Sequence, residues 1–393
     1  MTSATHGQAA EPAADWKDGK RYLWLIGLVV PLLPPTAIVL HGVTGLTALL
    51  WLGPLVVYGV IPLIDLAVGT DAENPPESLL RRLEDDRYYR WCVYLYLPAQ
   101  LVGLVWACAV ATGGGLTVLG YVGLALTTGV VAGIGINTAH ELGHKKESVE
   151  RWLSKIALAQ SGYGHFYVEH NRGHHVRVAT QEDPASSRLG ESFWRFLPRS
   201  VRGGVSSAWR LEKARLARGG RPPWTIRNDV LNAWLMSVVL WGALIAAFGP
   251  TVIPFLVIQG VFGFSLLEVV NYIEHYGLGR RREPSGRYER CAPKHSWNSN
   301  NVATNLFLFH LQRHSDHHAN PTRRYQSLRH FDEAPQMPSG YAAMVTLAYL
   351  PPVWRRVMDR RVLAHYGGDA TQANVQPGRE AKYGPLSPGS VAA

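Results

Sequence analysis

Long apolar stretches alternate along the chain with stretches crowded with charged residues. A membrane-spanning helix needs about 20 mostly apolar residues, because roughly 30 Å of hydrocarbon is crossed at about 1.5 Å per residue. Six stretches reach this length: Leu23–Leu40, Leu46–Ala67, Trp91–Thr112, Leu116–Thr138, Val230–Phe248 and Val252–Tyr272. Within them, Asp65 and Glu268 are the only carboxylates. The pattern predicts an all-α, polytopic membrane protein with six transmembrane helices.

Three short connections between these stretches carry no Lys or Arg, although the whole chain has a net charge of +10. They are His41–Gly45, Gly113–Gly115 and Gly249–Thr251. Since Lys and Arg accumulate on the cytoplasmic side of a membrane, both termini and the two long polar regions are expected there. The predicted organisation is a cytoplasmic segment (1–22), four transmembrane helices (23–138), a cytoplasmic region (139–229), two further transmembrane helices (230–272), a second cytoplasmic region (273–366) and a flexible tail or linker (367–393).

Histidine is abundant, and 12 of the 16 histidines fall between residues 140 and 318. Three clusters read HELGH from His140, HNRGHH from His170 and HSDHH from His314, and His275 follows the sixth apolar stretch. Residues three or four apart lie on one face of a helix, so each cluster can direct two or more imidazoles to one metal ion. We therefore interpret the clusters as metal ligands.

The clusters and the separate histidine together offer nine neutral nitrogen ligands. One zinc ion is satisfied by three or four protein ligands, so nine are enough for two metal ions. Imidazole suits zinc, copper, iron and nickel alike, and ligand type alone does not choose among them. Because the fourth and sixth helices end on the same side of the membrane, the clusters can converge there. This predicts a histidine-rich dimetal site in a helical cap on the cytoplasmic side.

Other kinds of site explain less of the sequence. The three cysteines, Cys92, Cys108 and Cys291, form no CxxC pair, which excludes a disulfide scaffold, a zinc ribbon and a rubredoxin-type iron site within this chain. The first cluster satisfies the HExxH pattern of zinc metalloproteases, in which Glu141 would activate water, but this interpretation uses only two of the histidines. A metal transporter would need metal-binding groups within the membrane, where the apolar stretches offer few.

Four segments resemble the histidine motifs of the membrane alkane 1-monooxygenase family. Asn137–Lys146 (NTAHELGHKK) is similar to the first histidine box, and Glu169–His175 (EHNRGHH) is similar to the second. Asn271–Gly277 (NYIEHYG) resembles a separate His-Tyr-Gly motif, and Leu311–His318 (LQRHSDHH) resembles the third box. The likeness runs from the first apolar stretches to about residue 330. Membrane fatty-acid desaturases and hydroxylases share this arrangement, but their second box usually reads HxxHH, whereas this chain has HxxxHH.

The resemblance implies a non-haem diiron enzyme that hydroxylates the terminal methyl group of medium- or long-chain n-alkanes. Such a reaction consumes O₂, two electrons and two protons, and it yields a 1-alkanol and water. A fatty-acyl desaturase or hydroxylase is the alternative. The implied iron ligands are His140, His144, His170, His174, His175, His275, His314, His317 and His318. Their division between the two irons stays open.

The electrons for this reaction must come from another protein module, because the chain has no GxGxxG fingerprint and no cysteine cluster. The family takes them from rubredoxin, which an NADH-dependent rubredoxin reductase reduces. A basic cytoplasmic surface fits an acidic carrier, since complementary charge speeds transient docking. The rubredoxin is expected as a separate protein or as a domain fused beyond the tail. The resemblance also implies the bacterial inner membrane as the location.

Carboxylates near the clusters are candidates to accept hydrogen bonds from the ligand imidazoles, because neutral ligands leave the charge of the metal uncompensated. Glu268 lies seven residues before His275, on the same face of the sixth helix. The other candidates are near the clusters in sequence: Glu141, Glu169, Asp183, Glu274 and Asp316. Because an alkane offers no polar handle, a narrow apolar tunnel must select it. The candidates for lining this tunnel are Trp51, Leu52, Val57 and Phe264.

Overall fold

The computed structural model describes residues 16–383, and all the regular elements in that part of the chain are helices. Six of these helices are long and apolar enough to cross a membrane. They are Leu23–Thr44, Thr47–Val68, Arg87–Thr112, Val118–Gly143, Asp229–Phe248 and Pro250–His275. Each overlaps one stretch expected from the sequence, so the prediction of an all-α protein with six apolar spans is confirmed. The side of the membrane on which the cap lies stays a prediction.

The first two spans are irregular helices. The first begins as a 3₁₀ helix, Leu23–Leu32, and continues as α1, Leu33–Thr44. The second passes from a 3₁₀ segment through α2, Leu52–Leu55, and a π-helical segment into α3, Ile61–Val68. Both spans contain prolines, at positions 31, 34, 35, 54 and 62. Since proline has no backbone N–H to donate, these residues favour breaks in the regular α-helical hydrogen bonding, and those in the first turns of α1 and α3 lie where a new α-helical segment begins.

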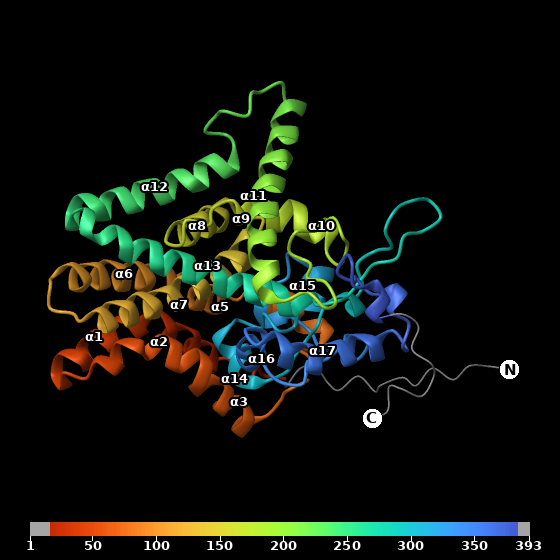
Figure 1. The fold of residues 1–393 in the computed structure, drawn as a ribbon, viewed down its shortest axis with the longest axis horizontal. Helices are drawn as coiled ribbons and strands as arrows, with labels where there is room; N and C mark the ends of the chain where they lie inside the picture. Colours follow the sequence, from red (N-terminus) through yellow and green to blue (C-terminus); the bar gives the residue numbers. More distant parts are fainter. Residues whose placement is uncertain (1–15, 384–393) are drawn as a thin grey trace.

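Two long helices, α7 (Val118–Gly143) and α13 (Ile253–His275), pack along each other at the centre of the bundle. Small residues allow this close approach, as in many membrane helix pairs. A Cβ atom added to Gly133 would lie 2.8 Å from the carbonyl oxygen of Gly263, and one added to Gly263 would lie 2.9 Å from the Cβ of Ala132. The helix α6 (Tyr96–Thr112) packs along α7, and α12 (Asp229–Phe248) packs against α6 (Figure 1).

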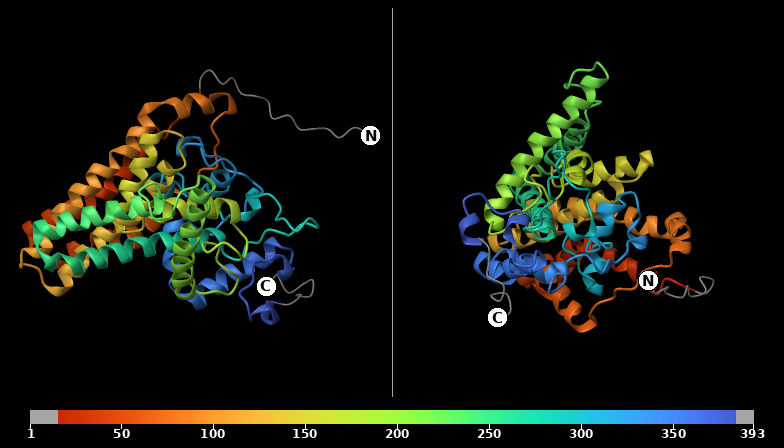
Figure 2. Two further views of the ribbon diagram at one scale, coloured as in Figure 1. Left: turned by 90° about the horizontal axis from the view of Figure 1, so that it is seen from above. Right: turned by 90° about the vertical axis from the view of Figure 1, so that its right-hand side faces the viewer.

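Most of the remaining helices gather at one end of the bundle, where α7 and α13 end (Figure 2). They form a cap over those two ends, and α11 stands out from its side (Figure 1). The cap helices are α9 (Phe166–Glu169), α10 (His175–Arg177), α11 (Phe193–Arg218), α14 (Val302–Phe307), α15 (His314–Ala319), α16 (Tyr341–Ala348) and α17 (Pro351–His365). The helix α8 (Ser148–Ala159) instead packs back along α7 and α12. The cap therefore brings the polar regions between and after the spans to the same end of the two central helices.

The segment after residue 366, expected from its composition to be a flexible tail, is packed as far as residue 383. The Leu189 N–H donates a 2.7 Å hydrogen bond to the Asn374 carbonyl oxygen. The buried Tyr383 hydroxyl donates a 2.7 Å hydrogen bond to Asp359 on α17. These contacts correct the expectation for residues 367–383, because backbone pairing and an aromatic anchor hold a segment whose Gly and Pro content alone suggests a linker. Residues 384–393 lie outside the described part.

Candidate metal centre

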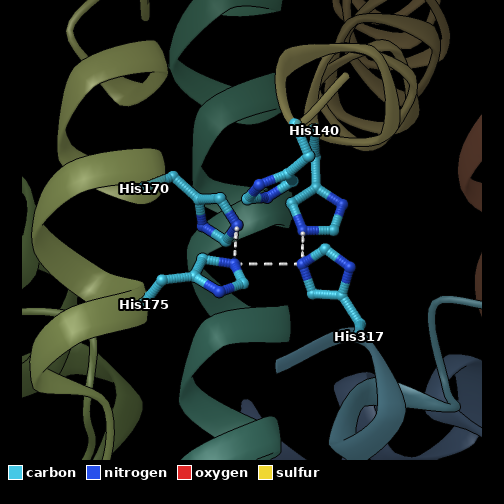
Figure 3. A group of neighbouring side chains, drawn as sticks. His140, His170, His175 and His317 are labelled. Atoms are coloured by element: carbon cyan, nitrogen blue, oxygen red, sulfur yellow. Dashed lines mark hydrogen bonds between the residues drawn. The ribbon is translucent and has the colours of Figure 1, made fainter. Parts of the chain in front are cut away.

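The nine histidines predicted as ligands come together in the structure as two groups. The first histidine group consists of His140, His144, His170, His175 and His317. The second histidine group consists of His174, His275, His314 and His318. Within each group, one nitrogen from every ring lies within 4.8 Å of the others. Figure 3 labels four rings of the first group, whose nitrogens point toward one another from three different segments of the chain.

Four segments deliver these rings to one place. His140 lies in the last turn of α7, and His144 follows four residues later on the same face. His275 is the last residue of α13. The short helix α15 divides its histidines: His314 and His318, four residues apart, enter the second group, whereas His317 turns toward the first. The packing of α7 against α13 and the position of α15 therefore decide the geometry of both groups.

The second histidine box contains a π-helical turn, which explains its additional residue. Residues His170–His174 form this turn, and the His175 N–H donates to the His170 carbonyl five residues earlier. A wider turn brings residues five apart onto one side, and the Nε2 atoms of His170 and His175 lie 3.0 Å apart. His174 consequently points elsewhere, into the second group. The π-helical turn in the HxxxHH motif thus directs the consecutive residues His174 and His175 into different histidine groups.

The short distances between ring nitrogens are those expected of ligands that converge on a cation. In the first group, the Nε2 of His317 lies 2.8 Å from that of His140 and 3.1 Å from that of His175 (Figure 3). In the second, the Nε2 of His314 lies 3.2 Å and 2.9 Å from those of His275 and His318. A neutral imidazole has only one N–H, so such a set cannot satisfy every nitrogen by hydrogen bonds.

Unpartnered nitrogens complete the fit to a metal. The Nε2 atoms of His144 and His174 are buried and have no hydrogen-bond partner. With metal–nitrogen bonds of about 2.1 Å, ligands on opposite sides of one ion are roughly 4 Å apart, close to the spacing in each group. The residues present therefore fit two ions of an imidazole-binding metal, one for each group.

Burial prepares these rings for metal binding. Desolvation, reinforced by neighbouring histidines, lowers the pKa of His170 and of His317 well below its ordinary value of 6.5. The same two causes lower the pKa of His318. Because only the neutral ring offers a free lone pair, protons do not compete with a metal for these nitrogens near neutral pH.

One of the candidate carboxylates, Asp183, contacts a ring of the second histidine group through its Nδ1. The Nδ1–H of His174 donates a 2.8 Å hydrogen bond to Oδ2 of Asp183, and the Ser186 hydroxyl donates one of 2.6 Å to the same oxygen. Burial alone would raise the pKa of Asp183, but the His174 ring and the Ser186 hydroxyl hold it below its ordinary value. Asp183 therefore fixes the tautomer of His174 that leaves Nε2 free for a metal.

The other candidate carboxylates have different partners. Glu274 is buried, and its Oε2 lies 3.3 Å from the Nε2 of His314 in the second group. Glu141 forms a 2.9 Å ion pair with Lys145, and Glu169 forms one of 2.7 Å with Arg177. Asp316 forms ion pairs with Arg323 and Arg329 at 3.0 and 3.2 Å. Glu268 accepts a hydrogen bond from Tyr163, a residue that the sequence pattern did not single out.

An apolar cavity lies between the central helices and the cap. Asn137 and Leu311, each three residues before a histidine of the two groups, lie in its wall. The remaining lining residues are Val57, Ile61, Gly133, Ile134, Leu266, Leu267, Val270, Thr304, Phe307, Leu308, Tyr341, Ala342 and Val345. The cavity therefore shares its walls with the segments that carry the histidines.

The four residues predicted to line a tunnel lie in different places. Val57 lines the apolar cavity. The Trp51 Nε1–H donates to the Leu119 carbonyl, and the Phe264 ring stacks on Tyr163 with ring centres 5.0 Å apart. Leu52 is half-buried and is not a lining residue of that cavity.

Comparisons with known proteins agree with this picture. Residues 116–348 match the sequence model of the fatty acid desaturase family. Alkane 1-monooxygenase 1 of Alcanivorax borkumensis is 47% identical to the chain over 368 residues, which are 93% of the chain and 91% of that protein. The alkane 1-monooxygenase of Pseudomonas putida is 44% identical over 373 residues, which are 95% of the chain and 93% of that protein. A xylene/toluene monooxygenase hydroxylase component, XylM, is 26% identical over 216 residues, 55% of the chain and 57% of that protein.

Proposed function

Because the chain belongs to the alkane 1-monooxygenase family, we propose that its two histidine groups hold one iron ion each for the terminal hydroxylation of n-alkanes. In this reaction an alkane, O₂, two electrons and two protons give a 1-alkanol and water. The observation that carries the proposal is the convergence of nine imidazoles beside an apolar cavity. When bound, the irons supply the redox chemistry with O₂, while the protein supplies ligand geometry, substrate position and exclusion of water.

The cavity wall is suited to an alkane because its few polar groups are already engaged. The Asn137 amide donates a 2.8 Å hydrogen bond to the Leu308 carbonyl, and the Tyr341 hydroxyl donates one of 2.7 Å to the Trp297 carbonyl. The Thr304 hydroxyl donates to Asp65. With these groups satisfied, the wall presents methyl, methylene and ring carbon to a substrate that dissolves in the membrane. A medium- or long-chain n-alkane enters with one end directed at the histidines.

The first histidine group is the one that an electron carrier can approach. His144 and His175 are its half-buried members, and the neighbouring Val176 side chain is 66% exposed. The guanidinium of Arg280 donates to the Val176 carbonyl and brings positive charge to this edge, whereas Arg172 is paired with Glu212 and Asp229. This basic edge fits an acidic one-electron carrier, for which we propose rubredoxin, reduced by an NADH-dependent rubredoxin reductase. The rubredoxin is separate or fused beyond the tail.

The proposed location is the bacterial inner membrane, with both termini and the metal centre on the cytoplasmic side. The distribution of charge supports this orientation, since the connections at one end of the bundle, residues 45–46, 113–117 and 249, contain no Lys or Arg. NADH and the reductase are cytoplasmic, so a cap on that side of the membrane is accessible to the reduced electron carrier.

The test is reconstitution of the purified protein with iron, rubredoxin, the reductase and NADH. We expect about two irons per chain, one for each histidine group, and conversion of octane to 1-octanol with matched consumption of O₂ and NADH. No 1-alkanol from alkanes of any length would refute the proposed function. The match to the fatty acid desaturase model favours one alternative, a fatty-acyl desaturase or hydroxylase. A lipid product with a new double bond or hydroxyl group would establish that alternative.

A further inference from the structure

A second, polar cavity lies beside the histidine groups and is not used by the mechanism above. It has about 20 Å³ of room for the centre of a water molecule, slightly more than the roughly 10–15 Å³ that one ordered water needs. Its wall includes one ligand from each group, His170 and His174. The other lining residues are Tyr163, His165, Phe166, Glu169, Pro184, Ala185, Ser200, Gly204, Glu268 and Asn271.

The helix α13 separates this polar cavity from the apolar one. Leu266, Leu267 and Val270 of α13 line the apolar cavity. Glu268 and Asn271 line the polar cavity. At about 100° per residue, the second pair lies on a face roughly 125° from the first set. One helix therefore has the apolar cavity on one side and a small polar chamber on the other, and its last residue, His275, lies on the same face as Glu268 and Asn271.

Glu268 is the most unusual residue in the polar cavity. Its side chain is 3% exposed, and its Oε1 accepts hydrogen bonds of 2.7 Å from the Tyr163 hydroxyl and 3.4 Å from the Asn271 amide. Both partners are neutral. Its second oxygen, Oε2, is buried and makes no hydrogen bond of standard distance and angle, although the Ser200 hydroxyl lies near the carboxyl group. The same holds for Oε2 of Glu169 in the same cavity, which has the Ser207 hydroxyl near it. Two such oxygens in a chamber with room for water make a site suited to a bound water molecule.

We propose that Glu268 is the residue that delivers protons to the metal centre, through water held in the polar cavity. This inference rests on the proposed function, whose reaction consumes two protons and two electrons and forms one molecule of water. The electrons come from the one-electron carrier. The protons need a separate route to the metal centre, because the apolar cavity on one side of that centre excludes water. Glu268 gives its proton from Oε2 to the cavity water, and solvent later restores that proton.

The contacts of Glu268 suit both of its protonation states. As a carboxylic acid it can donate from Oε2 to the cavity water, while Oε1 keeps the hydrogen bond from Tyr163. As a carboxylate it is stabilised by the donors on Oε1, since hydrogen bonds to a charged acceptor are stronger than those to a neutral one. The cavity also touches α11 at Ser200 and Gly204.

The test compares Glu268→Gln with a matched control, Asp359→Asn. Asp359 is another buried carboxylate that accepts tyrosine hydroxyl hydrogen bonds, of 2.6 and 2.7 Å, but it does not line the polar cavity. Each variant is purified with iron, and iron content, kcat, KM for octane, the solvent isotope effect and alkanol formed per NADH are measured. Infrared spectra of the iron-free proteins in H₂O and D₂O report the carbonyl stretch of a protonated carboxyl independently of turnover.

For Glu268→Gln we expect unchanged iron content and KM, and a fall in kcat on the order of 10²-fold, which is typical for loss of a proton donor. We also expect a larger solvent isotope effect, fewer alkanol molecules per NADH and loss of one protonated-carboxyl band. Asp359→Asn should match the wild type in turnover and coupling. Glu268→Asp, which keeps the acid, should recover part of kcat, and it replaces the Gln variant if that fails to fold.

Two results would overturn the proposal. One is wild-type turnover and coupling in Glu268→Gln, and the other is loss of iron from it, which would make Glu268 a positioning residue for the metal ligands. Failure of the wild type to form any 1-alkanol would instead refute the proposed function. In that case the infrared band alone would show whether Glu268 holds a proton.

Discussion

Replacing Asp183 by alanine should weaken the binding of one iron and leave the other in place. Asp183 is buried and accepts a 2.8 Å hydrogen bond from the Nδ1–H of His174, a ring of the second histidine group. A hydrogen bond to a charged acceptor contributes about 1.5–3 kcal/mol. Since about 1.4 kcal/mol corresponds to tenfold in affinity, the loss should lower iron affinity roughly 10- to 100-fold. Asp183→Asn, which keeps an oxygen acceptor without the charge, should lie between alanine and wild type.

The assay is removal of iron from the purified protein by a chelator at increasing concentration, with the metal counted by elemental analysis. Asp183→Ala should reach a plateau of about one iron per chain at a chelator concentration that leaves the wild type fully loaded. Ser186→Ala is the matched control, because it removes the 2.6 Å hydrogen bond to Asp183 and leaves the carboxylate on His174. Equal loss of both irons, or wild-type retention of both, would refute the role given to Asp183.

Three further outcomes follow from the packing, the cavity and the buried histidines. Gly133→Val should lower the thermal unfolding temperature, because its Cβ would lie 2.8 Å from the Gly263 carbonyl oxygen. The expected loss in the free energy of unfolding is about 1–3 kcal/mol. An unchanged melting temperature would contradict the close α7–α13 contact. Ala342→Phe fills part of the apolar cavity and should shorten the longest alkane converted, measured by product analysis over a series of chain lengths; an unchanged series would place the substrate elsewhere. Burial lowers the pKa of His165 and of His295 from 6.5 to about 4, so the folded protein resists protonation that the unfolded chain accepts. The stability of the iron-free protein is therefore fully present above about pH 6.5 and should fall as the pH drops toward 4, which thermal unfolding across that range would show; His295→Gln should reduce the slope.

The spans and the histidine clusters could be predicted because their signals are local. Apolar length decides a membrane helix, and spacing of three or four residues decides which imidazoles share a helix face. The division of the ligands between two groups could not be predicted. His174 and His175 are consecutive, yet a π-helical turn sends them to different groups. That turn depends on the packing of the whole cap, which no local pattern encodes.

Contacts between carboxylates and histidines were the hardest feature to predict. Glu141 and Asp316 are neighbours of ligands in sequence, but a helix directs adjacent residues to different sides, and both meet cations instead. Asp183 lies nine residues after His174 and reaches it through the fold of a loop. The apolar cavity presents the same difficulty, because bulky residues such as Trp51 fill space, whereas a cavity forms where the surrounding side chains leave space.

The tight seam between α7 and α13 limits how such an enzyme can change its substrate. At Gly133 and Gly263 the two backbones are in direct contact, so α13 cannot move outward to widen the apolar cavity without losing that contact. Any shift of α13 would also displace Glu268 on its opposite face. Variants that accept longer or bulkier hydrocarbons should therefore arise through smaller side chains on the cavity wall, with the helix axis held in place.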